Sequence, residues 1–525
     1  MLKSGIDTVV VCPGNRNAAL VHNFHAASMT CYEVTDERSA GFFALGLIEA
    51  NGGKPVAVCC TSGSAVLNLA PSVSEAFYRP LPLMVITADR PEMWIGQMDG
   101  QTMDQTKAFS GFVNKSVSLP EPNNEEERWY CNRLINEALV SLTLTRGPVH
   151  VNVRISEPMF DFSSRELPDE RLVSVCGYSC GDMRLSDRLT DIIKASSRPM
   201  ILVGQMLPET ASTCVSALKK LAERGVMILA ETLSNVHVDD ELRQLVRYDF
   251  DDVLSHGEPV RPDLLITFGG HVVSKRIKAY LRKEAIRCHI HVDKNSNVVD
   301  TYMSLTDKVM SEPSDFLALL CDLLPSDVSE DYRKSWSAGH VKEDVPVLGR
   351  LFSELSDEWT LHLANSSTVR KVQRIFNNKN TVYCNRGING IEGSVSSAVG
   401  FWAGAKKPTL LIVGDLSFFY DQNALWNNYV KAKTHDAPLR ILIINNGGGE
   451  IFYNFPSLRE SPCFDRCIVA SHDTSAKGIA EECGCIYYKA TDIFEFERYF
   501  YDFMNVKSKD VRIFEVFLSV TEIVN

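Results

Sequence analysis

The residues best suited to chemistry lie in two short segments near the C-terminal end of the sequence. Each is an apolar run that ends in glycine, aspartate or asparagine: Leu410 to Ser417 (LLIVGDLS) and Ile441 to Gly449 (ILIINNGGG). Runs of this kind are typical of buried parallel strands that enter loops. Asp415 and Asn446 would then lie at the carboxyl ends of two strands, where open α/β sheets bind ligands.

These two segments offer hard oxygen donors. The Asp415 carboxylate, the Asn446 amide oxygen and a carbonyl of the glycine loop suit Mg²⁺ bridging a diphosphate. The intervening segment Asp421–Lys433 has helical composition, so the whole predicts a βαβ unit. The alternative is a strand end with ordinary turn residues and no ligand.

Alternating strand and helix patterns predict the elements that position these segments. At 525 residues the chain is too long for one core, and we expect three doubly wound α/β domains, at 1–160, 182–340 and 346–525. The predicted strands are Thr8–Cys12, Val56–Cys60, Leu83–Thr87, Val149–Val153, Met200–Val203, Val226–Ala230, Leu264–Phe268 and Cys288–Val292. The predicted helices of the first domain are Ala18–Ala27, Glu37–Ala50 and Ser64–Tyr78.

Polar segments separate these predicted domains. They are Ser156–Gly181 and Pro325–Asp344, and the domain boundaries are placed there. Met1 precedes the first predicted strand by only a few residues, which leaves no room for a helix before it. Either this domain begins differently from its usual form, or the start is placed late.

Composition excludes several classes of protein. The chain is 45% hydrophobic and 23% charged, as in an ordinary globular protein. A net charge of −12 argues against nucleic acid or an anionic membrane as the main partner. No apolar run approaches the roughly 18 residues of a membrane span and no secretory signal is visible, so we expect a cytoplasmic protein. The 15 cysteines lie mostly in apolar strands and lack paired zinc-site spacing, which predicts reduced thiols.

Polar motifs also mark strand ends in the first predicted domain. Arg16 follows a Pro-Gly turn near a helix N-terminus, where a guanidinium and backbone N–H groups can bind a carboxylate together. Glu37 opens a helix rich in small residues, where the helix dipole favours an acid. The segments Thr61–Ser64 and Thr87–Pro91 mark two further strand ends. A solvated turn arginine and a structural first-turn acid are the simpler interpretations of these residues.

Taken in order, the motifs resemble those of thiamine-diphosphate enzymes of the MenD family, the 2-succinyl-5-enolpyruvyl-6-hydroxy-3-cyclohexene-1-carboxylate synthases. The GD…NN pair resembles the cofactor signature of the wider superfamily. The remaining motifs are PGNRN, DERSAGFFALGL, TSGSA, TADRPE, GQTMDQ and GPVHVNV, then Ser274 to Arg276, Asn365 to Arg370, Asn385 to Gly393 and Gly449 to Phe452. The resemblance covers nearly the whole chain.

This resemblance implies thiamine diphosphate as the cofactor, with Mg²⁺ or Mn²⁺. Glu37 would bind the aminopyrimidine and promote its imino form. Ile391 would hold the cofactor bent, although an isoleucine here could simply belong to the core. The implied cofactor-binding residues are Glu37, Ser62, Gly63, Ile391, Asp415, Ser417, Asn446 and Phe452, and the implied metal ligands are Asp415, Asn446 and Gly448.

The resemblance also implies the substrates 2-oxoglutarate and isochorismate. The enzyme, a transferase of menaquinone biosynthesis, would decarboxylate 2-oxoglutarate and add the succinyl carbanion to isochorismate, releasing CO2. Ser366, Arg370 and Arg386 would bind the 2-oxoglutarate part, and Arg90, Lys275 and Arg276 the isochorismate part. The full implied substrate-binding set is Arg16, Arg90, Lys275, Arg276, Ser366, Arg370, Arg386 and Phe452, with Phe455 lining the cavity; the implied catalytic set is Glu37, Arg16, Gln101, Arg370 and Arg386.

Glu37 and the GD…NN pair fall in different predicted domains. Because the superfamily places its cofactor between two subunits, we expect at least a homodimer, or a dimer of dimers. Two rival functions stay open. Another thiamine-diphosphate carboligase or decarboxylase, such as an acetolactate-synthase-like enzyme, would need fewer cations. A non-catalytic homologue would not need Glu37 and Asp415.

Three positions and one spacing depart from the family pattern. Asn15 replaces the usual serine before Arg16, Gly100 stands where asparagine is frequent, and Gly447 replaces a third asparagine. The GD…NN spacing of 446 − 415 = 31 residues is somewhat long. We expect the extra residues near Ala432–Pro438, and we expect the change at Gly447 to leave the metal ligands unaffected.

Overall fold

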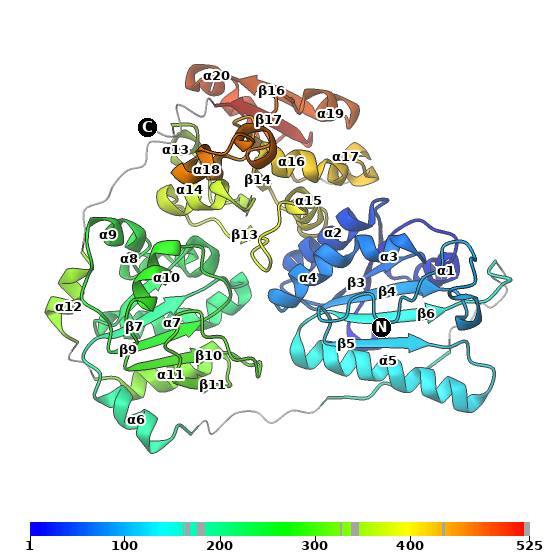
Figure 1. Cartoon of the computed structure of the whole chain (residues 1–525), viewed down its shortest axis with the longest axis horizontal. Helices are drawn as coiled ribbons and strands as arrows, with labels where there is room; N and C mark the ends of the chain where they lie inside the picture. The colour runs from blue at the N-terminus through cyan, green and yellow to red at the C-terminus, as the bar shows by residue number, and fades with distance from the viewer. Residues whose placement is uncertain are drawn as a thin grey trace. The chain divides into compact units, whose positions relative to one another are not determined.

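Three sheets, all of whose recorded strand pairs are parallel, are distributed along the chain in the computed structural model (Figure 1). The structure describes residues 1–160, 162, 168–175, 184–325, 328–337, 346–432 and 436–518. The predicted linkers and the predicted insertion near Ala432–Pro438 lie partly outside these residues. Within them, no helix combines the length and the apolar character needed to cross a bilayer. The predicted α/β class is confirmed.

The chain divides into two compact units. The first comprises Met1–Cys176, Leu361–Ser367 and Cys384–Asn525, and the second comprises Gly177–Thr360 and Thr368–Tyr383. The first sheet and most of the third belong to the first unit, and the second sheet belongs to the second. The boundaries of three separate domains stay a prediction.

The first sheet has the strand order β2-β1-β3-β4-β6-β5. Alternate residues of its strands face opposite sides: Val9 and Val11 pack with α1 and α5, and α2 contacts β1 and β3. The strands are β1 Thr8–Val11, β2 Thr30–Glu33, β3 Val56–Cys60, β4 Leu83–Asp89, β5 Lys115–Leu119 and β6 Val149–Arg154. The α-helices are α1 Ala18–Ala26, α2 Glu37–Ala50, α3 Ser64–Asn68, α4 Ala70–Tyr78 and α5 Glu125–Thr145.

The second sheet has the order β11-β10-β9-β7-β8. Apolar clusters cover both of its faces, which explains why its strands are continuous apolar runs. The strands are β7 Pro199–Val203, β8 Met227–Ala230, β9 Leu264–Phe268, β10 Cys288–Val292 and β11 Asp307–Val309. The helices are α6 Asp187–Lys194, α7 Pro208–Glu223, α8 Asp240–Leu245, α9 Phe250–His256, α10 Lys275–Arg282, α11 Pro313–Leu323, α12 Glu330–Ser335 and α13 Pro346–Ser353.

The third sheet has the order β13-β12-β14-β15-β17-β16. Its central strands β14 and β15 pair in parallel, with Gly414 opposite Ile444, as the apolar runs predict. The strands are β12 Thr360–Leu363, β13 Val382–Cys384, β14 Thr409–Gly414, β15 Leu439–Asn445, β16 Ile486–Ala490 and β17 Arg512–Phe517. The helices are α14 Ser367–Ile375, α15 Ser394–Ala405, α16 Asp415–Tyr420, α17 Asn428–Ala432, α18 Pro456–Arg459, α19 Lys477–Glu482 and α20 Ile493–Phe503.

The prediction of one helix over Asp421–Lys433 is wrong. The segment contains a short 3₁₀ turn, η5 Gln422–Leu425, followed by α17. Asn427 breaks the helix because its side chain bonds the backbone on both sides: it donates to the Ala424 carbonyl at 2.5 Å and accepts from the Val430 N–H at 3.0 Å. The predicted helix Ser64–Tyr78 is likewise two helices, α3 and α4, which meet at Leu69.

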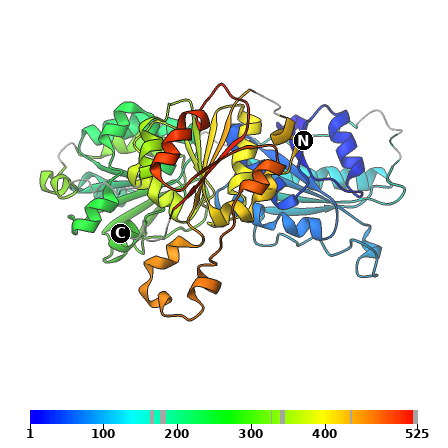
Figure 2. The same ribbon diagram turned by 90° about the horizontal axis from the view of Figure 1, so that it is seen from above.

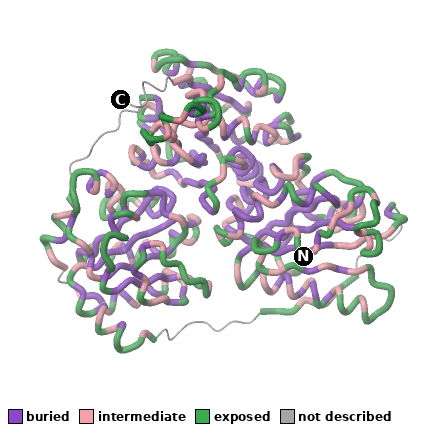
Figure 3. The backbone as a smooth tube through the Cα atoms, viewed as in Figure 1, coloured by how far each residue is buried: buried purple, intermediate pink, exposed green. Residues whose placement is uncertain are grey.

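Helices α2 and α15 pack against each other within the first unit, and both are buried along most of their length (Figure 3). Glycine permits this close approach. A Cβ atom on Gly46 would lie 2.1 Å from the Ser397 carbonyl oxygen, and one on Gly400 would lie 2.2 Å from the Phe43 carbonyl oxygen. Glycines of both helices therefore let α2, which begins at Glu37, pack directly against α15 within one unit.

Candidate active site

Asp415 begins α16 directly after β14, with its carboxylate buried. One carboxylate oxygen, Oδ2, accepts the backbone N–H groups of Asn446, Gly447 and Gly448 at 3.0, 2.8 and 3.1 Å. The Nε2 atom of His472 lies 3.5 Å from the same oxygen. Burial raises the pKa of Asp415, and the backbone donors and His472 oppose this effect. The two halves of the predicted GD…NN motif thus meet, as expected from the parallel pairing of their strands.

The donor set fits a hard divalent cation. It comprises the buried Asp415 carboxylate, the Asn446 amide and the carbonyl of Gly448, whose φ of 152° suits glycine. Among the described residues no cluster of three or more histidine, cysteine or acidic side chains could hold a metal. The cysteines that the structure describes are free, and most are buried. Cys176 and Cys180 lie outside the described residues.

Glu37 is the first residue of α2 and is partly buried. Burial raises its pKa, its own backbone N–H opposes this, and the neighbouring Asp36 carboxylate raises it further. Both neighbours of Glu37 contact the segment that follows Asp415. Asp36 accepts from the Asn423 side chain at 2.7 Å, and Arg38 donates to the Tyr420 carbonyl at 2.7 Å. The helix start that carries Glu37 is thereby anchored to α16 and η5.

The loop before α15 carries Ile391. Its side chain is 38% exposed, so it does not behave as the core isoleucine of the simpler interpretation. The Ile391 carbonyl accepts from the Ser417 hydroxyl at 2.6 Å, which ties the loop to α16. Ile391 is therefore fixed relative to α16, the helix that begins at Asp415.

Arg16 and Arg90 both reach one carboxylate, that of Glu157. Arg16 Nη2 lies 3.3 Å and Arg90 Nη1 lies 3.6 Å from Glu157 Oε1. The Arg16 side chain is only 5% exposed, whereas Glu157 is 66% exposed. A buried guanidinium needs an anionic partner. The first unit therefore contains a two-arginine position that binds a carboxylate, and its present occupant is an exposed side chain.

The buried side chain of Gln105 contacts the predicted cofactor loop Thr61–Gly63. Gln105 is buried, accepts from the Gly63 N–H at 2.9 Å and donates to the Ala88 carbonyl at 3.0 Å. Gln101 is exposed, has a φ of +54° and packs its backbone against Gly63. The GQTMDQ motif thus contacts the TSGSA motif, although the buried partner is its second glutamine.

Arg386 is buried beside Asn365. Its Nη1 donates to Asn365 Oδ1 at 3.0 Å, and its Nε is buried without a hydrogen-bond partner in the described structure. Asn365 also donates to the carbonyls of Asn385 and Gly390 at 2.6 and 2.8 Å, which closes the loop around Arg386. A buried guanidinium with an unused donor suits an anionic ligand.

Lys275, Arg276 and Arg370 belong to the second unit. Lys275 and Arg276 are exposed in the first turn of α10, where the helix dipole disfavours cations. Arg370 donates to the Val273 carbonyl at 3.4 Å. Ser366 belongs to the first unit, so the predicted pair Ser366 and Arg370 is divided between the units.

Phe452 and Phe455 lie on the segment that follows β15. Figure 2 shows this segment in orange, projecting from the third sheet. Phe455 is 41% exposed, and the ring of Phe452 lies against Gly449, where a Cβ atom would approach it to 2.7 Å. Both aromatic residues thus belong to the segment beside the GD…NN loop, and their role in lining a cavity stays a prediction.

Four further residues were not predicted: Glu75, Gln105, Glu157 and Glu231. Gln105 and Glu157 contact the predicted site residues Gly63 and Arg16. Glu75 and Glu231 accept backbone N–H groups directly beside Arg386 and Lys275. Glu75 and Glu231 offered a signal, because an acid within an apolar segment needs partners when it is buried. Their partners are far away in sequence and could not be named from it.

Comparison with known proteins identifies the class of enzyme. Residues 1–108 match the family described as "Thiamine pyrophosphate enzyme, N-terminal TPP binding domain". A benzoylformate decarboxylase from Polynucleobacter necessarius has the same fold, with a TM-score of 0.72, 17% identity and coverage of 99% of this chain and 97% of that chain. The fold is that of a thiamine-diphosphate enzyme.

Sequence relatives define the family more closely. The chain is 45% identical over 507 residues to the 2-succinyl-5-enolpyruvyl-6-hydroxy-3-cyclohexene-1-carboxylate synthase of Bacteroides thetaiotaomicron, covering 92% of this chain and 88% of the relative. It is 36% identical over 511 residues to the synthase of that name from Flavobacterium johnsoniae, covering 93% and 89%. The chain belongs to the 2-succinyl-5-enolpyruvyl-6-hydroxy-3-cyclohexene-1-carboxylate synthase family of thiamine-diphosphate-dependent enzymes.

Proposed function

We propose that this enzyme decarboxylates 2-oxoglutarate and transfers the succinyl group to isochorismate, releasing CO2, in menaquinone biosynthesis. The two-arginine position at Arg16 and Arg90 is the observation that best supports this reaction, because it already binds one carboxylate. The buried Arg386, with an unused donor, offers a second anion position. Both substrates are carboxylates, and an acetolactate-synthase-like enzyme would need fewer such positions. The cytoplasmic location expected for this protein stays a prediction.

Thiamine diphosphate, when bound, supplies the carbanion chemistry. Asp415, Asn446 and the Gly448 carbonyl would hold the Mg²⁺ or Mn²⁺ that binds its diphosphate. Ser62, Gly63, Ser417 and Phe452 would surround the cofactor, and Ile391 would support its bent form. Glu37 would bind the pyrimidine ring and exchange a proton there. A carboxyl group whose pKa is raised by burial suits that exchange, because proton transfer is fastest when the pKa approaches the working pH.

The remaining residues would bind and orient the substrates. Arg370, Arg386 and Ser366 are assigned to the 2-oxoglutarate part, and Arg90, Lys275 and Arg276 to isochorismate. Arg16 and Gln101 are assigned to the reacting centre. Charge-assisted contacts of this kind fix a substrate's orientation as well as its affinity.

A spectrophotometric assay tests the proposal. Isochorismate consumption should require 2-oxoglutarate, thiamine diphosphate and Mg²⁺ together, and CO2 should form in equal amount. Turnover of pyruvate in preference to 2-oxoglutarate would point instead to a generic carboligase. Absence of turnover with every 2-oxo acid, despite cofactor binding, would point to a non-catalytic homologue.

We further propose a homodimer in which two subunits share each cofactor, on the basis of the family resemblance. Mixing two inactive variants tests this arrangement. If Glu37 of one subunit serves the cofactor held by Asp415 of the other, a mixed dimer of Glu37→Gln and Asp415→Ala contains one intact site and regains activity. If both residues serve within one subunit, the mixture stays inactive although the subunits have exchanged.

A further inference from the structure

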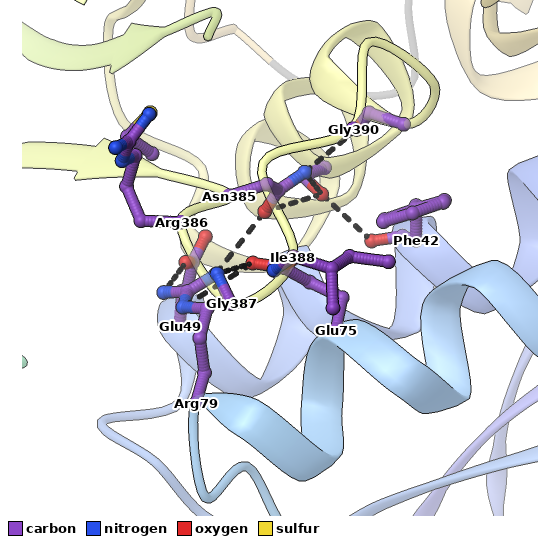
Figure 4. A network of polar contacts seen from close by, with 12 residues as sticks. Phe42, Glu49, Glu75, Arg79, Asn385, Arg386, Gly387, Ile388 and Gly390 are labelled. Carbon is purple, nitrogen blue, oxygen red and sulfur yellow. Dashed lines mark hydrogen bonds and ion pairs between the residues drawn. The ribbon is translucent and has the colours of Figure 1, made fainter. Parts of the chain in front are cut away.

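A buried ion cluster joins the first and third sheets within the first unit. It contains Glu49 of α2, Glu75 of α4 and Arg79, which follows α4 (Figure 4). Arg79 Nη2 lies 2.6 Å from Glu49 Oε1, and Arg79 Nε lies 3.8 Å from Glu75 Oε1. All three side chains are at most 6% exposed. Burying charged groups is costly, so a cluster of this kind needs an explanation beyond stability.

Glu75 uses its two carboxylate oxygens on the loop that precedes α15. Oε1 accepts the Gly387 N–H at 2.8 Å and Oε2 accepts the Ile388 N–H at 2.8 Å. Burial raises the pKa of Glu75, and Arg79 and these two N–H donors oppose that effect. The contact is therefore between an acid of α4 and two successive peptide groups of a loop more than 300 residues away in the chain.

Gly387 fits this contact and a larger residue would not. A Cβ atom at this position would lie 2.7 Å from the Glu75 carbonyl oxygen and 2.9 Å from Glu75 Oε2. The loop backbone thus lies directly against α4. Arg79 adds a second attachment, since it donates to the Asn385 side chain at 3.1 Å.

The peptide groups of Gly387 and Ile388, which Glu75 binds, lie between two residues that the proposed function uses. Arg386 directly precedes Gly387, and Ile391 follows Ile388 by three residues. Figure 4 shows the loop backbone beside the ion cluster and the Arg386 guanidinium pointing away from that cluster. The direction of Arg386 is therefore set from one side by Asn365 and from the other by the clamped peptide at Gly387.

We propose that Glu75 is a positioning residue of the active site, whose carboxylate fixes the loop that presents Arg386 and Ile391. The inference rests on the proposed function for its kinetic consequence. Glu75 would touch neither substrate nor cofactor; it would set the angle at which Arg386 meets the 2-oxoglutarate carboxylate. Its loss should therefore affect 2-oxoglutarate and cofactor binding much more than isochorismate binding.

Glu75→Gln is the test variant, because glutamine keeps the size but offers one acceptor oxygen to two N–H donors. Glu49→Gln is the matched control: it removes a charge from the same cluster without touching the loop. We expect Glu75→Gln to raise the KM for 2-oxoglutarate at least about tenfold, with the KM for isochorismate within about threefold of the parent. Glu75→Asp, which keeps two acceptor oxygens, should recover part of the loss.

Hydrogen exchange provides a readout that does not depend on activity. The amides of residues 387 and 388 should exchange at least about tenfold faster in Glu75→Gln and stay within about threefold of the parent in Glu49→Gln. Should Glu75→Gln fail to fold, Gly387→Ala disturbs the same contact from the loop side and should show the same signature.

Equal losses in the Glu75 and Glu49 variants would overturn the proposal, since they would indicate a general effect of the cluster. Unchanged amide protection in a folded Glu75→Gln protein would also overturn it. Failure of the proposed function is distinguishable: the parent would then not consume isochorismate, while faster exchange at 387 and 388 and weaker thiamine-diphosphate binding would still support a positioning role.

Discussion

Each of the two compact units contains a buried glutamate that accepts two successive backbone N–H groups. In the first unit, Glu75 accepts two successive backbone N–H groups next to Arg386. In the second, the buried Glu231, which follows β8, accepts the N–H groups of Val273 and Ser274 at 2.6 and 2.7 Å, directly before Lys275. We call each arrangement a carboxylate clamp. Both hold a loop that presents predicted substrate-binding cations.

The clamps differ in what they join. Glu75 connects a helix beside the first sheet to a loop of the third predicted domain, whereas Glu231 connects two loops at the ends of strands of one sheet. Glu231 therefore acts within one predicted domain and Glu75 acts across two predicted domains. Because the first clamp adjoins Arg386 and the second adjoins Lys275 and Arg276, the comparison predicts that the two substrates can be impaired separately.

The largest expected effect lies outside both clamps, at Glu37. Glu37→Gln keeps the side-chain size but removes the carboxylate, so turnover should fall at least about a hundredfold, or about 2.7 kcal/mol in the barrier, while cofactor still binds. Both substrates should be affected alike, since cofactor activation precedes either. Steady-state kinetics and calorimetry check this, with Glu33→Gln as the control. Turnover within threefold of the parent would remove Glu37 from this role.

Asp415, which belongs to the first unit, should control the affinity for thiamine diphosphate. Asp415→Ala removes the charged ligand of an otherwise neutral donor set, so thiamine-diphosphate affinity should fall at least about fiftyfold and lose its dependence on Mg²⁺. Calorimetric titration with and without Mg²⁺ measures this. Asp473→Ala, at an exposed position next to His472, is the control and should keep the parent's affinity. Unchanged Mg²⁺-dependent binding in Asp415→Ala would contradict the metal assignment.

The next largest effects should come from Arg370 and Arg276, which we expect to act on different substrates. Arg370→Ala should cost about 2 kcal/mol in kcat/KM for 2-oxoglutarate, through loss of a charge-assisted contact. Arg276→Ala should leave CO2 release from 2-oxoglutarate in a single turnover largely intact and impair isochorismate consumption. Arg282→Ala, at the other end of α10, is the control. If both variants impair the same step, the separation between substrates is wrong.

Local pattern and resemblance predicted the parallel sheets and the meeting of Asp415 with Asn446, because strand ends of a parallel sheet share one edge. The break at Asn427 was missed, since helical composition does not show when an asparagine side chain will bond the backbone on both sides. The clamps were also missed. Glu75 and Gly387 are separated by 312 residues, and only the packing of α2 and α4 against the third predicted domain brings them together.

Glu231 offers the direct test of the comparison. Glu231→Gln should loosen the start of α10 and raise the KM for isochorismate about fivefold. The effect on 2-oxoglutarate should be smaller, arising through the weak contact of Arg370 with Val273. Asp251→Asn is the matched control, because Asp251 accepts from the Ser274 hydroxyl and not from the loop backbone. A larger effect on 2-oxoglutarate than on isochorismate would break the proposed correspondence between clamps and substrates.

The smallest expected effect has the opposite sign. Glu157 places an exposed carboxylate on Arg16 and Arg90, where we expect a substrate carboxylate to bind, so the two compete for the same guanidinium groups. Glu157→Gln should lower the KM for isochorismate by about threefold at low ionic strength, and the gain should shrink as salt screens the exposed pair. Asp99→Asn separates this effect from a general change at Arg90, because Asp99 contacts Arg90 without Arg16. A rise in KM in Glu157→Gln would contradict this competition. Glu157 would then orient Arg16 and Arg90 for the substrate and would be part of the binding position itself.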